Sequence, residues 1–265
     1  MIIDGKKIAE DVVAKLNIER PLLPKDVRLG IVLTDGDMAT ASFVRIKERV
    51  AERLGIVVVR ETLSPDATTE EAIACVERLA KMTDGVVVQL PLPKSIDTEA
   101  VLAAIPLSQD PDVINPDPRV RMVRPPIAEA ISEIFLQSDV AAKQKKAVVV
   151  GMGRLVGAPA FELLSDLGAE VSAVTLEQGS LEELQDADIV ILGAGKPALV
   201  TPDLLKPGVV LIDAGTSEAS GKLVGDADPR CAEVAAVFTP VPGGVGPIAV
   251  AMLFRNLYAL VKSRG

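Results

Sequence analysis

The chain has 265 residues, which is enough for one large domain or two medium ones. Its net charge of −9 and the lack of a long basic run argue against nucleic acid as a partner. The sequence contains no histidine. This excludes Ser-His-Asp and Cys-His catalysis and removes the commonest metal ligand, so we expect no metal site. Proton transfer near neutral pH must then use Lys, Asp, Glu, Cys or water.

Hydrophobic residues make up 49% of the chain, with one Tyr, five Phe and no Trp. A core built from Val, Leu, Ile and Ala suits buried parallel strands. Cys75 and Cys231 lie far apart in sequence, which indicates no disulfide framework and fits a cytoplasmic protein. We expect no signal peptide, because Asp4, Lys6 and Lys7 interrupt any early apolar run. We also expect no apolar segment long enough to span a membrane.

The first half of the chain alternates helical and strand-like patterns. An amphipathic helix is predicted over 4–17, and apolar runs at 28–34, 55–61 and 84–90 are separated by helical patterns at 40–54 and 69–82. This order predicts a βαβαβ unit with a parallel sheet. A polar, proline-rich stretch at 106–120 is typical of a boundary loop.

Lys47 lies on the apolar side of the helix predicted over 40–54. On a helical wheel Phe43, Val50 and Leu54 fall within roughly 20° of one another, and Lys47 lies about 40° from Phe43. The lysine stem could lie along the core while its amine reaches water. Alternatively, Lys47 faces a cleft and has a chemical role.

Two further polar positions allow a functional and a structural interpretation. Gln89 ends a buried strand, at the edge of the sheet where ligands bind in open α/β folds, although it could simply bond a loop. Asp110 and Asp112 lie in the boundary loop, where such residues are more often turn formers. A carboxylate of this loop that faces a cleft could instead bind an amino-pyrimidine group.

The second half begins with a strand, a glycine-rich turn and a helix, at "KKAVVVGMGRLVGAPAFELL". Gly151 allows the tight turn, Gly153 permits close approach of a phosphate, and the helix that starts near Val156 and Gly157 favours an anion. Arg154 could hold a phosphate. The spacing G-x-G-x-x-x-G differs from the usual G-x-G-x-x-G, but its context favours dinucleotide binding over a structural turn.

Later positions complete the predicted cofactor site. Glu177 follows Gly157 by 20 residues, where a carboxylate can bond the ribose hydroxyls of NAD, although a solvated strand-end glutamate fits equally well. Apolar runs at 187–195 and 208–215 contain Gly193 and Gly215 near their ends, which we include among the cofactor-binding residues.

The segment "TPVPGGVGP" at 239–247 joins rigid prolines to several glycines, just before a final helical pattern at 247–262. The backbone amides of Gly243, Gly244 and Gly246 could form an anion nest or approach a cofactor, or the segment could be only a turn.

Taken together, these motifs resemble the methylenetetrahydrofolate dehydrogenase/methenyltetrahydrofolate cyclohydrolase family, almost from end to end. The matching segments are "IIDGKKIAEDV", "VVVQLPLP", "VVVGMGRLVGAP", "GKPALV", "LIDAG", "GKLVGDAD" and "TPVPGGVGP", in the family's order. The resemblance implies that Lys47 is catalytic, that Gln89 supports it, and that Asp112 binds the pterin ring. It places Phe43 and Pro242–Gly244 at the substrate.

The resemblance implies two reactions, oxidation of 5,10-methylenetetrahydrofolate with NADP or NAD and hydrolysis of the methenyl product to 10-formyltetrahydrofolate. We expect two parallel-sheet α/β domains with the ligands in the cleft between them. These are a folate-binding domain over 1–120, completed by a C-terminal helix at 247–265, and a Rossmann domain over 121–246. A homodimer is implied by the family alone.

Some residues depart from the family pattern. Phe43 stands where the family usually has Tyr, Gly153 stands where it usually has Ser, and its P-C-T-P stretch is shortened to "RPP" at 124–126. These departures leave open a dehydrogenase without cyclohydrolase activity or a non-catalytic binding paralogue. A shikimate dehydrogenase-like enzyme with a Lys–Asp pair is a further alternative, but it would lack "QLPLP" and "PVPGGVGP".

Overall fold

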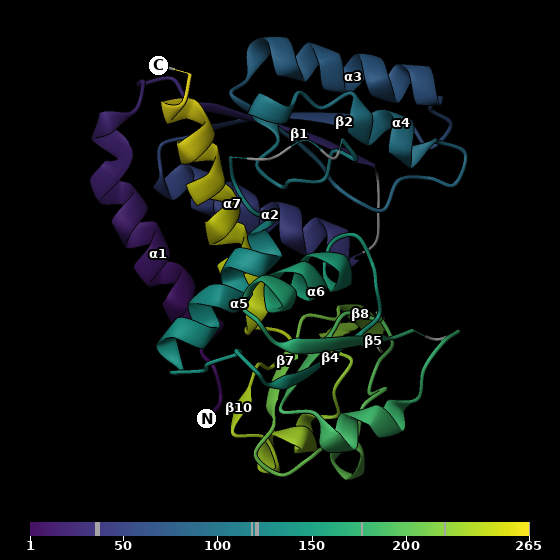
Figure 1. The fold of residues 1–265 in the computed structure, drawn as a ribbon. Coiled ribbons are helices and arrows are strands. Elements are labelled where there is room, and N and C mark those ends of the chain that lie inside the picture. The colour runs from purple at the N-terminus through teal and green to yellow at the C-terminus, as the bar shows by residue number, and fades with distance from the viewer. Residues whose placement is uncertain (35–37, 118, 120–121, 176, 220, 265) are drawn as a thin grey trace. The chain divides into compact units, whose positions relative to one another are not determined.

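The chain folds into two compact units, each with its own parallel sheet (Figure 1). The computed structural model describes residues 1–34, 38–117, 119, 122–175, 177–219 and 221–264, with only the backbone of 38–42. The three-stranded unit comprises Glu10–Pro126 and Val250–Gly265, and the five-stranded unit comprises Met1–Ala9 and Ile127–Ala249. The first nine residues thus belong to the five-stranded unit, whereas the sequence-based division places them with residues 10–120.

The three-stranded unit consists of helices with a small sheet between them. Its elements are α1 (Gly5–Glu19, which begins in the other unit), the 3₁₀ turn η1 (Arg20–Leu22), β1 (Arg28–Thr34), α2 (Met38–Arg53), β2 (Val57–Leu63), α3 (Thr69–Met82), β3 (Gly85–Val88), α4 (Thr98–Ala103), η2 (Leu107–Gln109) and the end of α7 (Val245–Lys262).

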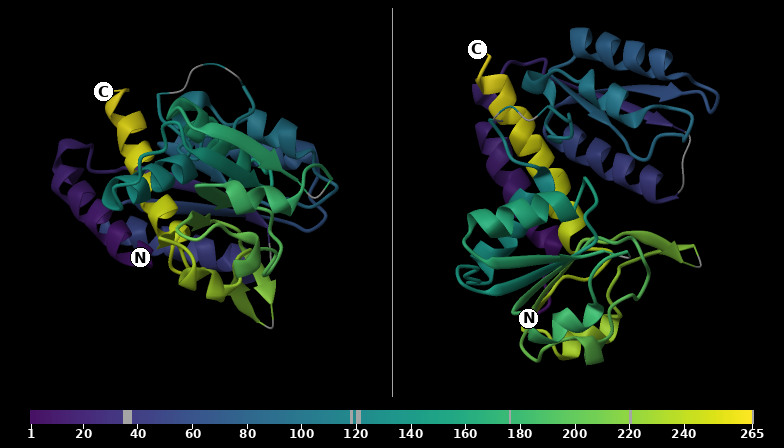
Figure 2. Two further views of the ribbon diagram at one scale, coloured as in Figure 1. Left: turned by 60° about the horizontal axis from the view of Figure 1, so that its bottom comes forward. Right: turned by 45° about the vertical axis from the view of Figure 1, so that its right-hand side comes forward.

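The sheet of this unit has the order β2-β1-β3, with all strands parallel. Helix α3 covers one face and α2 the other (Figures 1 and 2). Strand β1 is buried along most of its length, as its apolar run predicts. The parallel crossovers place Gln89, the residue after β3, at the carboxyl edge of the sheet.

The five-stranded unit contains α5 (Pro126–Gln137), β4 (Lys146–Val150), α6 (Gly157–Asp166), β5 (Glu170–Val174), η3 (Leu181–Asp186), β6 (Ile189–Leu192), η4 (Pro202–Leu204), β7 (Val210–Asp213), β8 (Ser217–Ala219), β9 (Lys222–Val224), η5 (Pro229–Glu233), β10 (Val237–Phe238) and the start of α7.

Its main sheet has the order β10-β7-β6-β4-β5 and is entirely parallel. Helix α6 packs on one face, and the short helices η3 to η5 lie toward the other (Figure 1). The register pairs Val150 with Leu192 and Leu192 with Asp213, so β4, β6 and β7 end side by side. The loops that follow them therefore start from one edge, where open α/β sheets bind ligands.

The predicted α/β class with two parallel sheets is confirmed, and the second sheet, counted from β4, has the doubly wound strand order 2-1-3-4-5. The second strand starts at Val57 instead of 55, because Gly55 adopts a positive φ of 61° and ends the preceding helical turn. The sequence analysis missed α4, α5 and the β8–β9 hairpin. The six residues of α4 are too few to establish a helical period.

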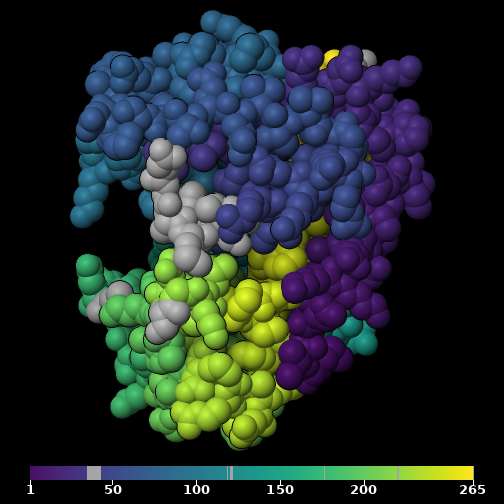
Figure 3. All heavy atoms as spheres, turned by 180° about the vertical axis from the view of Figure 1, so that it is seen from behind, coloured from purple at the N-terminus to yellow at the C-terminus, as the bar shows by residue number. Residues whose placement is uncertain are grey.

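Helix α7 is long and apolar enough to cross a membrane by length and composition, so the expectation that no segment has this length is wrong. However, 67% of it is buried inside the structure, and core helices of globular proteins pass the same test. In Figure 3 only a narrow strip of the C-terminal helix is visible beside α1. Its apolar character is therefore weak evidence for a membrane span.

Candidate active site

Lys47 lies at the centre of the buried face of α2. Val44, Ala51 and Leu54 are buried on the same side of the helix, and Lys47 itself is only 7% exposed. On the helical wheel these residues lie within about 60° of Lys47. The amine therefore does not reach out to water, and its charge needs partners inside the protein.

The partners of Lys47 come from two separate loops of the three-stranded unit. Its Nζ donates a hydrogen bond to Gln89 Oε1 at 3.1 Å and lies 3.7 Å from Asp112 Oδ2. Gln89 Nε2 in turn donates to the carbonyl oxygen of Leu90 at 3.2 Å, which keeps the amide oxygen facing the lysine. The three residues predicted as catalytic thus form one cluster, in which Lys47 and Gln89 are buried and Asp112 is half-buried.

The loop that carries Asp112 is held by buried polar contacts. Asp110 Oδ2 accepts a hydrogen bond from Asn115 N at 2.9 Å, and Pro111 O accepts one from Asn256 Nδ2 at 2.9 Å. Val113 adopts a positive φ of 57°, which turns the chain directly after Asp112. Asp110 therefore shapes the turn, while Asp112 faces Lys47. The structural interpretation applies to Asp110, and the functional interpretation applies to Asp112.

Phe43 lies one helical turn before Lys47 and is half-buried. Its ring carries no polar group, so it contributes an apolar wall and no hydrogen bond. An ammonium group has three N–H donors; Gln89 accepts one hydrogen bond from it, while Asp112 at 3.7 Å forms an ion pair without a hydrogen bond. A further donor can serve a ligand, where it can stabilise developing negative charge or transfer a proton.

In the five-stranded unit, the glycine-rich loop after β4 is tightly packed. Gly151 has a φ of 86°, and a Cβ added there would lie 2.7 Å from Ala194 Cα. A Cβ at Gly157 would overlap the carbonyl oxygen of Gly151. Neither residue can therefore carry a side chain without moving the backbone. Gly153 is different, because a Cβ there would meet only open space, where a ligand can approach.

The start of α6 offers fewer free amides than the motif alone suggests. Ala158 N already donates to Gly153 O at 3.1 Å, and Pro159 has no N–H. Val156 provides no side-chain cap. Instead its side chain occupies the space where a Cβ of Gly193 would lie, so the loop after β6 packs directly on the phosphate loop.

A cavity of about 180 Å³ opens beside this loop. Its lining comes from the ends of β4, β5 and β6 and from the segments after them: Val150, Gly151, Val174, Thr175, Gly179, Leu181, Ala194 and Leu199. Of the predicted cofactor residues, only Gly151 lines it. Sequence reasoning missed Thr175, which directly follows β5, and Ala194, which is the second residue after β6.

Arg154 and Glu177 are both exposed, and neither lines this cavity. Thr175 Oγ1 accepts hydrogen bonds from Gln178 N at 3.0 Å and Glu177 N at 3.3 Å, which shapes the turn after β5. Glu177 therefore sits on a turn whose backbone is fixed, with its carboxylate in solvent.

The Pro-Gly segment and Gly215 have structural partners in the five-stranded unit. Gly243 has a φ of 105°, and its carbonyl oxygen accepts a hydrogen bond from Gly5 N at 2.9 Å. Gly244 N donates to Pro240 O at 2.8 Å, closing the turn around Pro242 before α7. Gly215 packs against the carboxyl group of Asp226.

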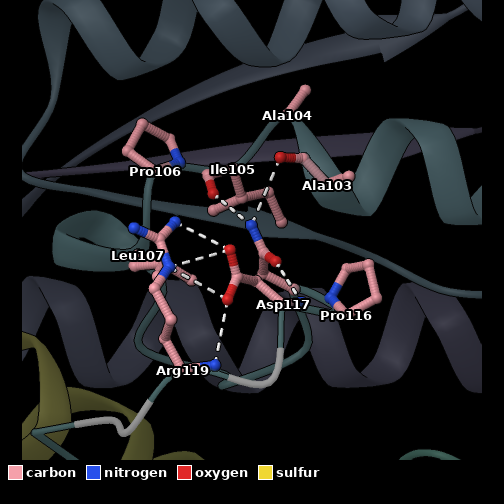
Figure 4. A pocket seen from close by; sticks show the side chains of 9 residues that line it. Ala103, Ala104, Ile105, Pro106, Leu107, Pro116, Asp117 and Arg119 are labelled. Atoms are coloured by element: carbon pink, nitrogen blue, oxygen red, sulfur yellow. Dashed lines mark hydrogen bonds and ion pairs between the residues drawn. The ribbon is translucent and has the colours of Figure 1, made fainter.

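A second cavity, of about 470 Å³, lies in the three-stranded unit, apart from Lys47 (Figure 4). Asn115 Nδ2 donates across it to Ile105 O at 2.7 Å, and Arg119 pairs with Asp117 at 2.7 Å. Its lining includes none of the predicted catalytic residues. Within the described part of the chain, no group of three His, Cys, Asp or Glu side chains could hold a metal ion.

The chain matches known proteins over nearly its whole length. The catalytic-domain model of the tetrahydrofolate dehydrogenase/cyclohydrolase family matches residues 3–112, and its NAD(P)-binding-domain model matches 125–265. A bifunctional protein FolD from Methanospirillum hungatei is 38% identical over 277 residues, covering 100% of this chain and 98% of that protein.

Two solved structures are similar over their whole length. The bifunctional FolD enzyme from Campylobacter jejuni superimposes with a TM-score of 0.92 at 28% identity, covering 100% of this chain and 99% of that chain. The Trypanosoma brucei FolD, complexed with NADP cofactor and inhibitor, gives 0.91 at 31% identity and covers 100% and 98%.

Proposed function

The chain belongs to the tetrahydrofolate dehydrogenase/cyclohydrolase family, and from this premise we propose that it carries out both of the family's reactions. It oxidises 5,10-methylenetetrahydrofolate to 5,10-methenyltetrahydrofolate with NADP or NAD, and it hydrolyses the product to 10-formyltetrahydrofolate. The observation that carries the proposal is the cluster of the buried Lys47 with Gln89 and Asp112. A buried lysine with an amide and a carboxylate partner is suited to proton transfer.

The five-stranded unit fits a nicotinamide dinucleotide. Gly151 and Gly157 are sterically required, Gly153 leaves the loop open, and the adjoining cavity lies at the carboxyl ends of parallel strands. Arg154, Glu177, Gly193 and Gly215 are proposed to complete the site. When bound, the nicotinamide ring accepts the hydride.

The chain's own residues supply orientation and charge. In the hydrolytic step, water adds to the positively charged methenyl carbon and loses a proton, and the bond from this carbon to N5 breaks as N5 takes up a proton. Lys47 transfers these protons, or its charge stabilises the oxyanion that forms when the hydroxyl of the tetrahedral intermediate is deprotonated. Gln89 holds the ammonium group in place. Asp112 binds the amino-pyrimidine edge of the pterin, and its distance of 3.7 Å from Lys47 leaves its carboxylate available for that contact. Phe43, Pro242, Gly243 and Gly244 are proposed to contact the substrate.

We propose NADP as the cofactor, with NAD as a rival. The relative from T. brucei was solved with NADP. Against this, Glu177 is acidic and exposed on the turn after β5, where a carboxylate would repel a 2′-phosphate and bond a ribose hydroxyl.

The remaining partners are also proposals. The net charge of −9 supports the proposal that the protein binds neither nucleic acid nor anionic membranes. The free, buried thiols of Cys75 and Cys231 support a reducing, cytoplasmic compartment. A homodimer is proposed from the family, and light scattering after size-exclusion chromatography tests it, since a monomeric mass would contradict it.

The proposed function is tested with purified protein, 5,10-methylenetetrahydrofolate and either NADP or NAD, by following reduced nicotinamide and methenyl-folate by absorbance. We expect both to form and the methenyl signal then to decay faster than in an enzyme-free control. Reduced nicotinamide with a methenyl signal that persists at the control rate would mean that cyclohydrolase activity is absent. No turnover with either cofactor would contradict the proposal.

A further inference from the structure

Apart from Gly215, three family-like segments have no assigned role in the reaction: "GKPALV", "LIDAG" and "GKLVGDAD". The structure brings them together around two buried aspartates of the five-stranded unit. Asp213, the last residue of β7, is 1% exposed, and Asp226, which follows β9, is 0% exposed. A buried carboxylate is costly unless it is well hydrogen-bonded, so each must have strong partners.

Asp226 binds three consecutive backbone amides of the loop after β6. Its Oδ2 accepts hydrogen bonds from Ala194 N at 2.7 Å and Gly195 N at 3.0 Å, and its Oδ1 accepts one from Lys196 N at 2.7 Å. Three successive amides that converge on one anion form a nest. Here the nest is filled by the chain's own carboxylate, so these amides hold the loop in one conformation and do not serve a phosphate.

Asp213 holds the backbone that carries Asp226. Its Oδ1 accepts hydrogen bonds from Gly215 N at 3.0 Å and Asp226 N at 3.2 Å, and its Oδ2 accepts one from Ala227 N at 2.8 Å. A Cβ at Gly215 would overlap the Asp226 carboxyl group, and a Cβ at Gly225 would overlap that of Asp213. The close fit leaves neither carboxylate room to shift.

The loop that Asp226 fixes borders the cofactor cavity. Ala194 and Gly151 both line that cavity. The two residues are in close contact, because a Cβ added to Gly151 would lie only 2.7 Å from the Cα of Ala194. Displacement of the loop would therefore change the shape of the cavity and the support of the phosphate loop.

The energetic balance supports a role for the pair beyond packing. Burial raises the pKa of both Asp213 and Asp226, while the three amides on each favour the ionised form. Well-packed apolar residues at these two positions would avoid the cost of burying carboxylates. The presence of two buried aspartates therefore points to a requirement for one defined loop position.

We propose that Asp226 is a positioning residue for the nicotinamide cofactor, and that Asp213 supports it from behind. Asp226 acts through the backbone of Ala194–Lys196 and does not itself contact the reacting atoms. This inference deepens the proposed function and rests on its assignment of the dinucleotide to this unit.

The test compares Asp226→Asn with Asp186→Asn, which removes an exposed aspartate from the same unit. NADP affinity is measured by isothermal titration calorimetry, without turnover. We expect the Asp226→Asn variant to bind NADP about tenfold more weakly or worse, because the loop amides lose a charged acceptor. The control should bind as the wild type does.

Kinetics separate positioning from general damage. The KM for NADP should rise in Asp226→Asn while kcat at saturating NADP stays close to wild type. Hydrolysis of methenyltetrahydrofolate, which needs no nicotinamide, should be unchanged, although the Tm should fall because the Asn side chain cannot accept all three amide hydrogen bonds. Unchanged NADP affinity would overturn the inference, as would equal losses in cofactor binding and hydrolysis.

If Asp226→Asn does not fold, Asp213→Asn provides the decisive variant, because it leaves the Asp226 carboxylate in place and weakens only its support. A folded Asp213→Asn protein with wild-type NADP affinity would then overturn the inference, and a weaker affinity would support it. A wild type that binds NADP but does not oxidise the folate would contradict the proposed function, while the affinities would still decide the role of Asp226.

Discussion

The two units compensate their buried charges in different ways. In the three-stranded unit, the Lys47 ammonium group is met by side chains, an amide oxygen at 3.1 Å and a carboxylate oxygen at 3.7 Å. In the five-stranded unit, Asp213 and Asp226 are met by backbone amides, three on each.

The difference separates a charged group that is proposed to act on the substrate from carboxylates that fix the backbone in place. Side chains can change partners when a ligand arrives, so Lys47 can exchange a contact for one with the substrate. Backbone amides are fixed by the strands around them, and a carboxylate bound to three of them ties distant segments together. A buried charge is therefore not evidence of catalysis until the nature of its partners is known.

The largest expected effect comes from Lys47→Ala. We expect cyclohydrolase activity to fall by about 10²–10⁴-fold, because the group that stabilises or transfers charge is lost. Some hydride transfer should remain, since the protein mainly orients the two rings in that step. Initial rates of both reactions are measured on the same preparation.

Arg49→Ala is the matched control, because it removes an exposed cation from the same helix. Lys47→Met tests whether the loss reflects the charge or the missing stem. Equal residual rates for both reactions would contradict the assigned role of Lys47.

The backbone-bound cluster should affect stability as a function of pH. Burial raises the pKa of Asp213 from its ordinary value of 3.8 to about 7. Between these pH values the folded chain binds a proton that the unfolded chain releases. The contribution of Asp213 to the free energy of unfolding is therefore fully present below about pH 4 and is lost as the pH rises through 7. The loss is at most about 1.4 kcal/mol per pH unit.

Asp213→Asn should remove this dependence. Urea unfolding from pH 5 to 8 should show that the wild type loses more stability than the variant, with Asp186→Asn following the wild type. The pKa of Asp226 is raised in the same direction, so part of the slope remains. Parallel profiles for wild type and Asp213→Asn would show that Asp213 does not titrate in this range.

Phe43→Tyr tests whether a hydroxyl group near Lys47 increases the rate of hydrolysis. Phe43 lies one turn from Lys47, and a hydroxyl there could add a hydrogen bond near the amine. We expect cyclohydrolase activity to rise by up to about fivefold, which corresponds to one hydrogen bond of about 1 kcal/mol. An unchanged hydrolysis rate would show that the missing hydroxyl does not limit the reaction.

The smallest expected effect concerns Glu177. Its carboxylate is exposed, so removing its repulsion of a 2′-phosphate should change relative cofactor use by only about two- to fivefold. Glu177→Ala should improve kcat/KM for NADP relative to NAD, most clearly at low salt. If the ratio stays the same at low and high salt, Glu177 does not belong to the cofactor site.

Much of the fold could be predicted from local patterns. The runs at 28–34 and 69–82 agree with β1 and α3 residue for residue, because buried parallel strands and amphipathic helices have distinct periods. The short α4 and the β8–β9 hairpin lack such a period. The hairpin pairs only three residues from each strand and α4 has only six residues, so neither is long enough for a period to identify it.

The sequence by itself determined the fold class, the family and the residue types available for chemistry, because periodicity, composition and motif order are local properties of the chain. It left open whether Lys47 reaches water and whether Asp112 is only a turn former. Only the tertiary structure decided these points, since it brings α2, the end of β3 and the loop at 110–115 together and buries the amine among them. The same holds for Asp226, which lies 30 residues from Lys196 in sequence and binds it through the fold alone.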